Sequence, residues 1–356
     1  MGVPVRRAAI VYHAEIADYD LGEGHPVRGD RFPRYVRLLK SLGLFDKGLR
    51  LVEPEAATRE DLLLVHSQEY MDKVEKLAAE NGMLAEDTPV NPGILRGVMR
   101  IVGAALEAGE LAVRGDVQLA QGIGGGLHHA GRDWGEGFSV FNDVAICAKS
   151  LVDRRGLERV MIFDTDAHTG HGTMEIFYSD PRVLYLSSHQ DPTALYPNTG
   201  FIDQIGEGKG RGYTVNVPLP VGADDDCMGR VLRRVFFPLV EQFRPQVLIR
   251  SGGADSHWRD EIGNLGLTYN GLWSIGRAVG EASERFGLPI VDLLCGGYEP
   301  GREEKGLYSI FAGELGFEPP YKDRIPKTRK KVGVLEATDR TIDELSRKLS
   351  SYWNLK

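Results

Sequence analysis

Short apolar runs recur along the chain between segments with helical spacing. They cover residues 8–12, 117–120, 160–163, 183–186, 247–249 and 290–294. Several of them are continuously apolar instead of alternating with polar residues, which is typical of strands that helices cover on both faces. The pattern therefore predicts a buried, parallel sheet.

Two intervening helices have readable ends. The first opens with Asn91 as cap and Pro92 in the first turn, and Gly109 is expected to end it. The second opens at Thr268 and is expected to stop at Gly287. Strands that alternate with helices predict βαβ units in one doubly wound α/β fold.

The domain organisation follows from the lack of an internal repeat or a long Pro/Gly/Ser linker. A length of 356 residues allows one or two domains, and we predict a single domain over residues 1–356. Ile342, Leu345 and Leu349 have helical spacing, which predicts an amphipathic C-terminal helix within an extension that begins near residue 325. A partner-binding role for this helix stays open.

Composition and charge narrow the function. Apolar residues make up 42% and charged residues 26%, as in soluble globular proteins. A formal net charge of -8 disfavours a general nucleic-acid binder and suits a cationic substrate such as lysine or a polyamine. The short basic cluster at residues 327–331 is interpreted as a solvated linker.

The spacing of the cysteines and the N-terminal residues indicate in which cellular compartment the protein is expected. Cys147, Cys227 and Cys295 are widely spaced, so neither a disulfide framework nor a cysteine zinc site is predicted. The apolar stretch at residues 8–12 is too short for a signal peptide or a membrane span. We expect a cytoplasmic protein without a membrane partner.

Candidate chemistry begins with the polar residues that directly follow the strand at 160–163, because ligands of α/β sheets bind beyond the carboxyl ends of strands. Asp164, Asp166, His168 and His171 lie there. Alternation places the first three on one side, where two or three of them can converge on a cation. A turn with a helix cap is the alternative, but it does not explain the histidines.

Three further candidates follow other strands, each within a glycine-rich segment. Asp255 is a possible third metal ligand, although such a residue alone is usually a turn or cap. His128 and His129 form a tandem pair with near-neutral unperturbed pKa, suited to a general base and acid, unless the loop merely lies on the surface. Tyr298 can donate to a developing oxyanion, or serve as a core or rim aromatic.

Together these clusters resemble the metal-dependent histone deacetylase family, which includes acetoin-utilisation proteins and acetylpolyamine deacetylases. The resemblance covers most of the chain up to about residue 301. It is carried by His25-Pro26, Leu127-His128-His129-Ala130, residues 137–145, the Asp166/His168 segment, residues 196–200, Gly253-Ala254-Asp255 and Gly296-Gly297-Tyr298. It implies the single-domain, parallel-sheet, three-layer arginase/deacetylase α/β fold.

The resemblance also implies a metal centre. Zn²⁺ would be held by Asp166, His168 and Asp255, and so oxygen-rich a ligand set also admits Fe²⁺ or Co²⁺. The metal and Tyr298 would polarise an acyl carbonyl while His129 removes a proton from the attacking water. A protonated histidine would then release the amine.

Supporting positions are implied in the same way. Asp164 would orient His128, and K⁺ or Na⁺ would bind below the metal. The site nearer the metal matches Asp164, Asp166, His168, Ser187 and Ser188. The farther site matches Phe177, Asp180, Val183 and Tyr213. The walls of the acyl-lysine channel match Gly137, Phe138 and Tyr196, and its rim carboxylate matches Asp87.

One departure concerns proton transfer. His171 lies where the family usually has Asp or Asn, the acceptor expected to orient His129. A carboxylate stabilises an imidazolium by charge, whereas a neutral imidazole accepts only one hydrogen bond. We hypothesise that His129 is a weaker base here, with the basic limb of its pH profile displaced toward acid. An unchanged pH–rate profile and rate in His171→Asp would remove this idea. Arg250 also departs from expectation, and its orientation is open.

Three functional interpretations remain. The leading one is a deacetylase acting on acylated lysine or a related amine, including an acetylpolyamine or a small-metabolite amide. A ureohydrolase of the same fold would need further carboxylates for two manganese ions, and Asp255 has only Asp260 near it in sequence. The third is a catalytically weak protein that binds acyl ligands, motivated by His171. Oligomeric state is not predicted.

Overall fold

The computed structural model describes residues 6–294, 296–328 and 330–355, so Cys295 of the predicted cysteine set and Arg329 of the basic cluster lie outside the described residues. Its main strands are β1 (Ala8–Val11), β2 (Arg50–Val52), β5 (Leu119–Gly122), β6 (Val160–Asp164), β7 (Val183–Gln190), β8 (Thr214–Leu219), β9 (Val247–Gly252) and β10 (Ile290–Leu294). Within the described residues they form an eight-stranded sheet in the order β2-β1-β5-β10-β9-β6-β7-β8. The strand pairs with a described register are parallel, as predicted.

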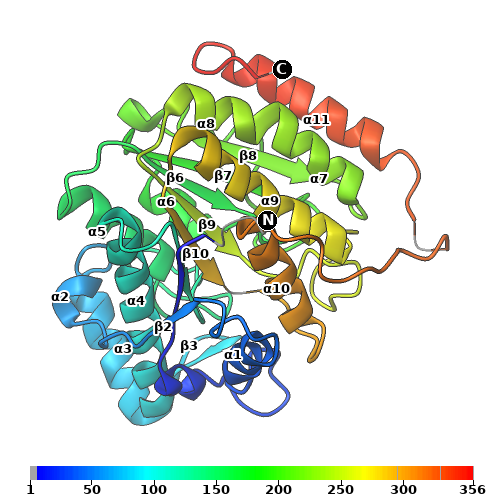
Figure 1. Ribbon diagram of the computed structural model, residues 1–356. Coiled ribbons are helices and arrows are strands. Elements are labelled where there is room, and N and C mark those ends of the chain that lie inside the picture. The colour runs from blue at the N-terminus through cyan, green and yellow to red at the C-terminus, as the bar shows by residue number, and fades with distance from the viewer. Residues whose placement is uncertain (1–5, 295, 329, 356) are drawn as a thin grey trace. The chain divides into compact units, whose positions relative to one another are not determined.

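Helices flank these strands (Figure 1). They are α1 (Arg31–Ser41), α2 (Arg59–Leu62), α3 (Gln68–Glu80), α4 (Pro92–Val113), α5 (Asp143–Asp153), α6 (His171–Ile176), α7 (Asp225–Val231), α8 (Phe237–Phe243), α9 (Tyr269–Phe286), α10 (Glu303–Glu314) and α11 (Val334–Leu349). Short helical turns cover η1 (Ala14–Asp18), η2 (Gly208–Gly210) and η3 (Leu232–Phe236), and β3 (Met83–Ala85) pairs antiparallel with β4 (Thr88–Pro89). No helix among the described residues is long and apolar enough to cross a membrane.

The chain divides into two compact units. Of the described residues, the first unit contains 6–157, 171–176 and 291–294, and the second contains 158–170, 177–290, 296–328 and 330–355. In the first unit α4 packs against β1, β5 and α5, and in the second α9 packs along α10. The single-domain organisation stays a prediction.

Both predicted ends hold at α9, whereas at α4 only the N-terminal end holds: Asn91 caps the helix by accepting from the Ile94 N–H at 2.9 Å, and Pro92 is its first residue. Thr268 caps α9 by accepting from the Asn270 and Gly271 N–H groups, and Gly287 ends it with a φ of 68°. By contrast, α4 continues past Gly109 to Val113. A Cβ at Gly109 would lie 3.0 Å from the Cys147 Sγ of α5, so this glycine permits close helix packing and does not stop the helix.

The C-terminal helix lies within the predicted extension. Helix α11 starts at Val334, and residues 317–326 contain no helix. Three prolines in that stretch, Pro319, Pro320 and Pro326, lack the N–H that a helix interior requires. The predicted inward positions are confirmed, because Ile342, Leu345 and Leu349 are buried and α11 packs on α7 and β8.

The sheet positions the candidate residues of the second unit. Strands β6 and β9 pair in parallel along their buried lengths, and Asp164 of β6 lies opposite Ser251 of β9. The segments that follow both strands therefore leave the sheet at the same edge. These segments contain Asp166, His168 and Asp255.

Candidate metal centre and histidine cluster

The turn after β9 brings Asp255 to the end of β6. Gly252 has a φ of 116°, a region that side chains other than glycine rarely adopt, and a Cβ there would lie 2.6 Å from the backbone nitrogen of Asp166. The chain can pass this closely only because Gly252 lacks a side chain. Backbone N–H groups then fix both carboxylates: Ala167 donates to Asp255 Oδ2 at 3.0 Å, and His168 donates to Asp166 Oδ1 at 2.9 Å.

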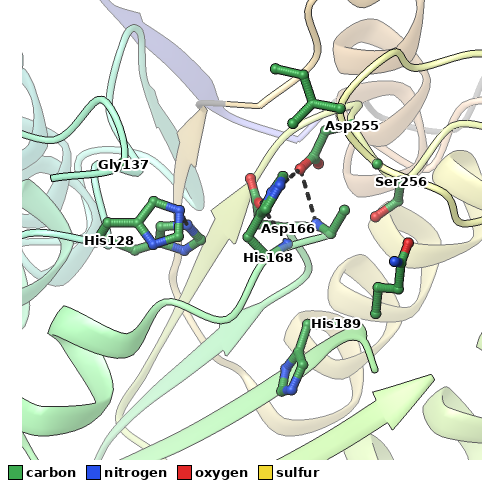
Figure 2. Close-up of polar contacts among 12 residues, drawn as sticks. His128, Gly137, Asp166, His168, His189, Asp255 and Ser256 are labelled. Atoms are coloured by element: carbon green, nitrogen blue, oxygen red, sulfur yellow. Dashed lines mark hydrogen bonds and ion pairs between the residues drawn. The ribbon is translucent and has the colours of Figure 1, made fainter. Parts of the chain in front are cut away.

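Asp166, His168 and Asp255 converge, as Figure 2 shows. His168 Nδ1 lies 2.9 Å from Asp166 Oδ1 and 3.2 Å from Asp255 Oδ2, and the three side chains are only 4%, 7% and 0% exposed in sequence order. One potential ligand atom from each residue lies within 4.8 Å of the others. Among the described residues, no second group of three such side chains approaches this closely.

The electrostatics of this group favour a cation. Burial and the neighbouring charge of Asp166 raise the pKa of Asp255 well above its usual range. Burial disfavours the charged form of His168, but hydrogen bonds to Asp166 and Asp255 outweigh it and raise its pKa to about 10. Two carboxylates buried side by side repel each other unless a positive charge lies between them.

Two further observations show that the residues fit a metal ion. The buried Oδ1 of Asp255 has no hydrogen-bond partner among the described residues, although such atoms are normally satisfied. A Cβ at Gly296 would lie 2.7 Å from Asp166 Oδ2 and 2.8 Å from Asp255 Oδ1, so glycine keeps the space beside these oxygens free of a side chain. One imidazole nitrogen with carboxylate oxygens suits a divalent transition metal.

Asp164 lies just before this group. Its Oδ1 accepts from the Asp166 N–H at 3.2 Å, and its Oδ2 accepts from the Tyr185 hydroxyl at 3.2 Å. Its predicted pairing with His128 stays a prediction. For the predicted monovalent-cation sites, Asp164 lies opposite Ser187 in the sheet, and the buried Ser188 Oγ has no hydrogen-bond partner among the described residues.

Tyr298 is held through its backbone. Its N–H donates to Asp260 Oδ2 at 3.0 Å, and Asp260 Oδ1 accepts from the Ile262 and Gly263 N–H groups. Burial raises the pKa of Asp260. The Asp260 carboxylate thus braces the loop that presents Tyr298, a role that the sequence did not reveal, and it does not belong to the metal-ligand group.

The tandem histidines belong to the first unit, in a loop that α5 anchors. Asp143 accepts from the Gly126 N–H at 2.9 Å and the Leu127 N–H at 2.7 Å. Burial raises the pKa of Asp143 to about 6, against the effect of these hydrogen bonds. The glycines ahead of His128 are needed here, since a Cβ at Gly125 would collide with this carboxylate.

Asn142 and His66 brace the same loop. Asn142 Nδ2 donates to the Ala130 carbonyl at 2.8 Å and the His128 carbonyl at 3.3 Å. The Asn142 N–H in turn donates to His66 Nε2 at 3.0 Å. Burial lowers the pKa of His66 to about 4, so this acceptor is neutral at physiological pH.

His128 and His129 continue into a chain of side chains. His128 Nε2 lies 3.2 Å from His129 Nε2, and His129 Nδ1 lies 3.2 Å from His171 Nδ1. His171 Nε2 lies 3.1 Å from Glu136 Oε1, and the ring of Trp134 stacks on His171 with centroids 4.8 Å apart. His171 therefore occupies the place beside His129 that the sequence predicted. The sequence reasoning missed Glu136, whose only signal was a carboxylate seven positions after His129.

The predicted substrate residues divide between the units. Asp87 Oδ1 accepts from the Gly137 N–H at 3.2 Å, and the neighbouring Thr88 hydroxyl accepts from the Phe138 N–H at 3.1 Å. His25 lies edge-on to Phe138 with ring centroids 4.6 Å apart. Tyr196, in the second unit, is partly exposed.

Arg250 does not belong to the metal group. Its side chain is fully buried, and its Nε lies 3.8 Å from Glu314 Oε1 of α10. Its Nη1 donates to the Gly252 carbonyl at 2.9 Å. The open question of its orientation is thus resolved in favour of the helix layer.

Comparisons with known proteins show which family this chain resembles. A model of the histone deacetylase domain matches residues 25–313. A probable deacetylase of Archaeoglobus fulgidus is 35% identical over 356 residues, covering 97% of this chain and 98% of that protein. Acetoin utilization protein AcuC of Bacillus subtilis is 34% identical over 302 residues, covering 82% and 76%. The crystal structure of the HDA15 HD domain superposes with a TM-score of 0.87 at 25% identity, covering 98% of this chain and 95% of that one.

Proposed function

Because the chain belongs to the histone deacetylase family, we propose that it is a metal-dependent deacetylase that hydrolyses the amide of an acylated amine. Family membership supports a hydrolytic deacetylase. The observation that carries metal dependence is the buried group of Asp166, His168 and Asp255, in which Asp255 Oδ1 has no hydrogen-bond partner among the described residues. We assign Zn²⁺ to this group, with Fe²⁺ or Co²⁺ as alternatives.

The proposed reaction joins water to an acyl carbon and breaks the carbon–nitrogen bond. A divalent ion held by the three ligands supplies Lewis acidity. His129 accepts the proton of the attacking water, and the Tyr298 hydroxyl donates a hydrogen bond to the oxyanion that develops on the acyl oxygen. A protonated histidine of the pair then delivers a proton to the leaving nitrogen, so that a carboxylate and an amine are released.

The proposed substrate is acylated lysine or a related acylated amine. Asp87, Gly137, Phe138 and Tyr196 are proposed to contact it, and the net charge of -8 suits a cationic molecule. Acetylpolyamines and small-metabolite amides are the alternatives. Cytoplasmic location, a single-domain organisation and K⁺ or Na⁺ sites near Asp164 and Ser188 are proposed alongside.

A deacylation panel tests the proposed function. The metal-loaded protein is assayed on acetyl-lysine peptides, acetylpolyamines and longer acyl-lysines, each with and without a chelator. We expect hydrolysis of at least one class that the chelator abolishes and added Zn²⁺ restores. Hydrolysis that is indifferent to the chelator contradicts metal dependence, and a lack of any hydrolysis contradicts the deacetylase.

Two alternatives predict different outcomes. A ureohydrolase would bind two manganese ions per chain, but Asp260, the nearby carboxylate in sequence, is occupied by backbone N–H groups around Tyr298. A catalytically weak acyl-binding protein would bind acyl-lysine without turnover above an Asp166→Ala control. The position of His171 beside His129 motivates this second alternative.

A further inference from the structure

We infer that Glu136 and His171 form a relay that positions His129. The carboxylate that stabilises protonated His129 is then Glu136, which acts through the ring of His171 and does not touch His129 directly. The inference rests on the proposed function, because it concerns the residue that accepts the proton from water. It goes beyond that function by giving a role to Glu136, which neither the resemblance nor the sequence reasoning identified. The relay also replaces the view of His171 as an isolated neutral acceptor.

The order of the contacts fixes the tautomers. A carboxylate only accepts hydrogen bonds, so His171 Nε2 carries a proton and donates it to Glu136 Oε1 across 3.1 Å. Nδ1 of neutral His171 then has a lone pair, which accepts from His129 Nδ1–H across 3.2 Å. His129 Nε2 is consequently the basic nitrogen. His128 Nε2 lies 3.2 Å from it, and two lone pairs would repel at that distance, so His128 carries a proton on its Nε2 and His129 Nε2 keeps the accepting lone pair.

The relay explains where the positive charge goes when His129 accepts a proton from water. When His129 takes a proton at Nε2, its Nδ1 proton can shift along the hydrogen bond to His171 Nδ1. His171 then becomes an imidazolium whose other N–H faces the Glu136 carboxylate, and opposite charges stabilise each other. Delivery of the proton to the leaving amine reverses the shift. One proton enters the histidine chain from water and one leaves it to the amine, so the protonation state of the relay is restored after each cycle.

The surroundings hold the relay in place. Trp134 stacks on the His171 ring at an interplanar angle of 23°, and the His171 side chain is 12% exposed. Glu136 is 41% exposed, so its carboxylate lies at the rim while the imidazoles lie inside. A carboxylate at the solvent end avoids the desolvation cost of burying one beside His129.

Among the described residues, other charged groups face the histidine segment from α5 and from the loop that contains Trp134. Asp143 of α5 faces the glycine loop and acts electrostatically on His128. Arg132 and Asp133, an exposed pair with nitrogen and oxygen 4.0 Å apart, belong to the same loop as Trp134. Glu136 is the group with a described hydrogen bond to His171 Nε2.

A double-mutant cycle on the metal-loaded full chain tests the relay. In the parent, we expect Glu136→Gln to lower kcat for the best substrate of the deacylation panel roughly 10- to 100-fold with little change in KM. In a His171→Asp background the new carboxylate lies next to His129 directly, so the same substitution is expected to change kcat by less than about twofold. Glu175→Gln, an exposed glutamate of α6, is the matched control. Equal losses in both backgrounds, or none in the parent, overturn the relay.

A second measurement does not depend on activity. In ¹⁵N-histidine-labelled protein without metal, with His171→Asp identifying the signal, His171 is expected to be protonated at Nε2 and unprotonated at Nδ1 near neutral pH. Glu136→Gln should lower its titration midpoint by about one pH unit, because the carboxylate favours the imidazolium. A midpoint indifferent to Glu136→Gln, or the Nδ1–H tautomer, contradicts the relay. The parent could show the Nε2–H tautomer of His171 and a midpoint that depends on Glu136, yet no hydrolysis that a chelator abolishes. In that case the proposed function would be contradicted and the relay would be supported.

Discussion

The metal-ligand group of the second unit and the histidine chain of the first unit both gather ionisable side chains, but they distribute charge in opposite ways. Asp166 and Asp255 bury two carboxylates beside one imidazole. The histidine chain buries imidazoles and keeps the Glu136 carboxylate at its exposed end. Concentrated negative charge in a buried place attracts a cation, whereas a row of neutral imidazoles ending in a carboxylate suits proton transfer. The arrangement of charge thus distinguishes a group suited to binding a cation from a group suited to proton transfer, although both contain the same types of residue.

The largest expected effect comes from removing charge at the metal group. Asp255→Asn keeps the shape of the side chain but leaves one carboxylate for the ion. We expect metal affinity and kcat to fall more than roughly 100-fold. Metal content after dialysis and hydrolysis rate are measured together, with the exposed Asp226→Asn as control. Full metal content in Asp255→Asn would remove this residue from the ligand set.

Loss of the Tyr298 hydroxyl should affect the rate without affecting the metal. We expect Tyr298→Phe to lower kcat roughly 100-fold with KM and metal content retained, because the hydrogen bond forms to charge that develops only during reaction. Steady-state kinetics with metal analysis check this, and Tyr352→Phe, at an exposed tyrosine, is the control. If KM rises while kcat holds, Tyr298 belongs to substrate binding.

A smaller effect is expected from filling the space beside the carboxylates. A Cβ at Gly296 would press on Asp166 Oδ2 and Asp255 Oδ1, so Gly296→Ala should weaken metal binding roughly tenfold. Gly229→Ala is the control, since its Cβ would meet only the flexible end of Arg233. Metal titration followed by calorimetry measures both variants. Equal affinities would mean that the carboxylates tolerate displacement.

The last expected effect is on folding stability and not on activity, and it concerns His66, which braces the histidine loop. The folded-state pKa of His66, about 4, lies below the ordinary value of about 6.5. As pH falls from about 6.5 toward 4, the unfolded chain takes up this proton first, and stability is lost. Between pH 7 and 5 the parent should lose about 2 kcal/mol more unfolding free energy than His66→Gln. Denaturant titrations at both pH values check this, and parallel losses would contradict it.

The fold class and the candidate pair Asp166 and His168 were readable from local patterns in the sequence, whereas Asp255 was only a possible ligand until the family resemblance was considered. Apolar runs indicated six of the eight strands of the main sheet, whereas β2 and β8 were not predicted. Asp166 and His168 follow one of the predicted strands directly. Gly109 misled the helix prediction, because its close contact with Cys147 of α5 is a tertiary feature. Glu136 was missed for the same reason: its contact with His171 spans 35 positions, and no local spacing indicates it. Asp260 likewise acts through a backbone contact 38 positions away.

Stepwise addition of Zn²⁺ to metal-free protein, with acyl release followed at each step, tests the central claim most directly. The three-ligand group predicts that the rate rises with added Zn²⁺ and reaches its plateau at one ion per chain. A plateau at two ions, or hydrolysis that proceeds at full rate before any ion is added, would contradict a deacetylase built on Asp166, His168 and Asp255.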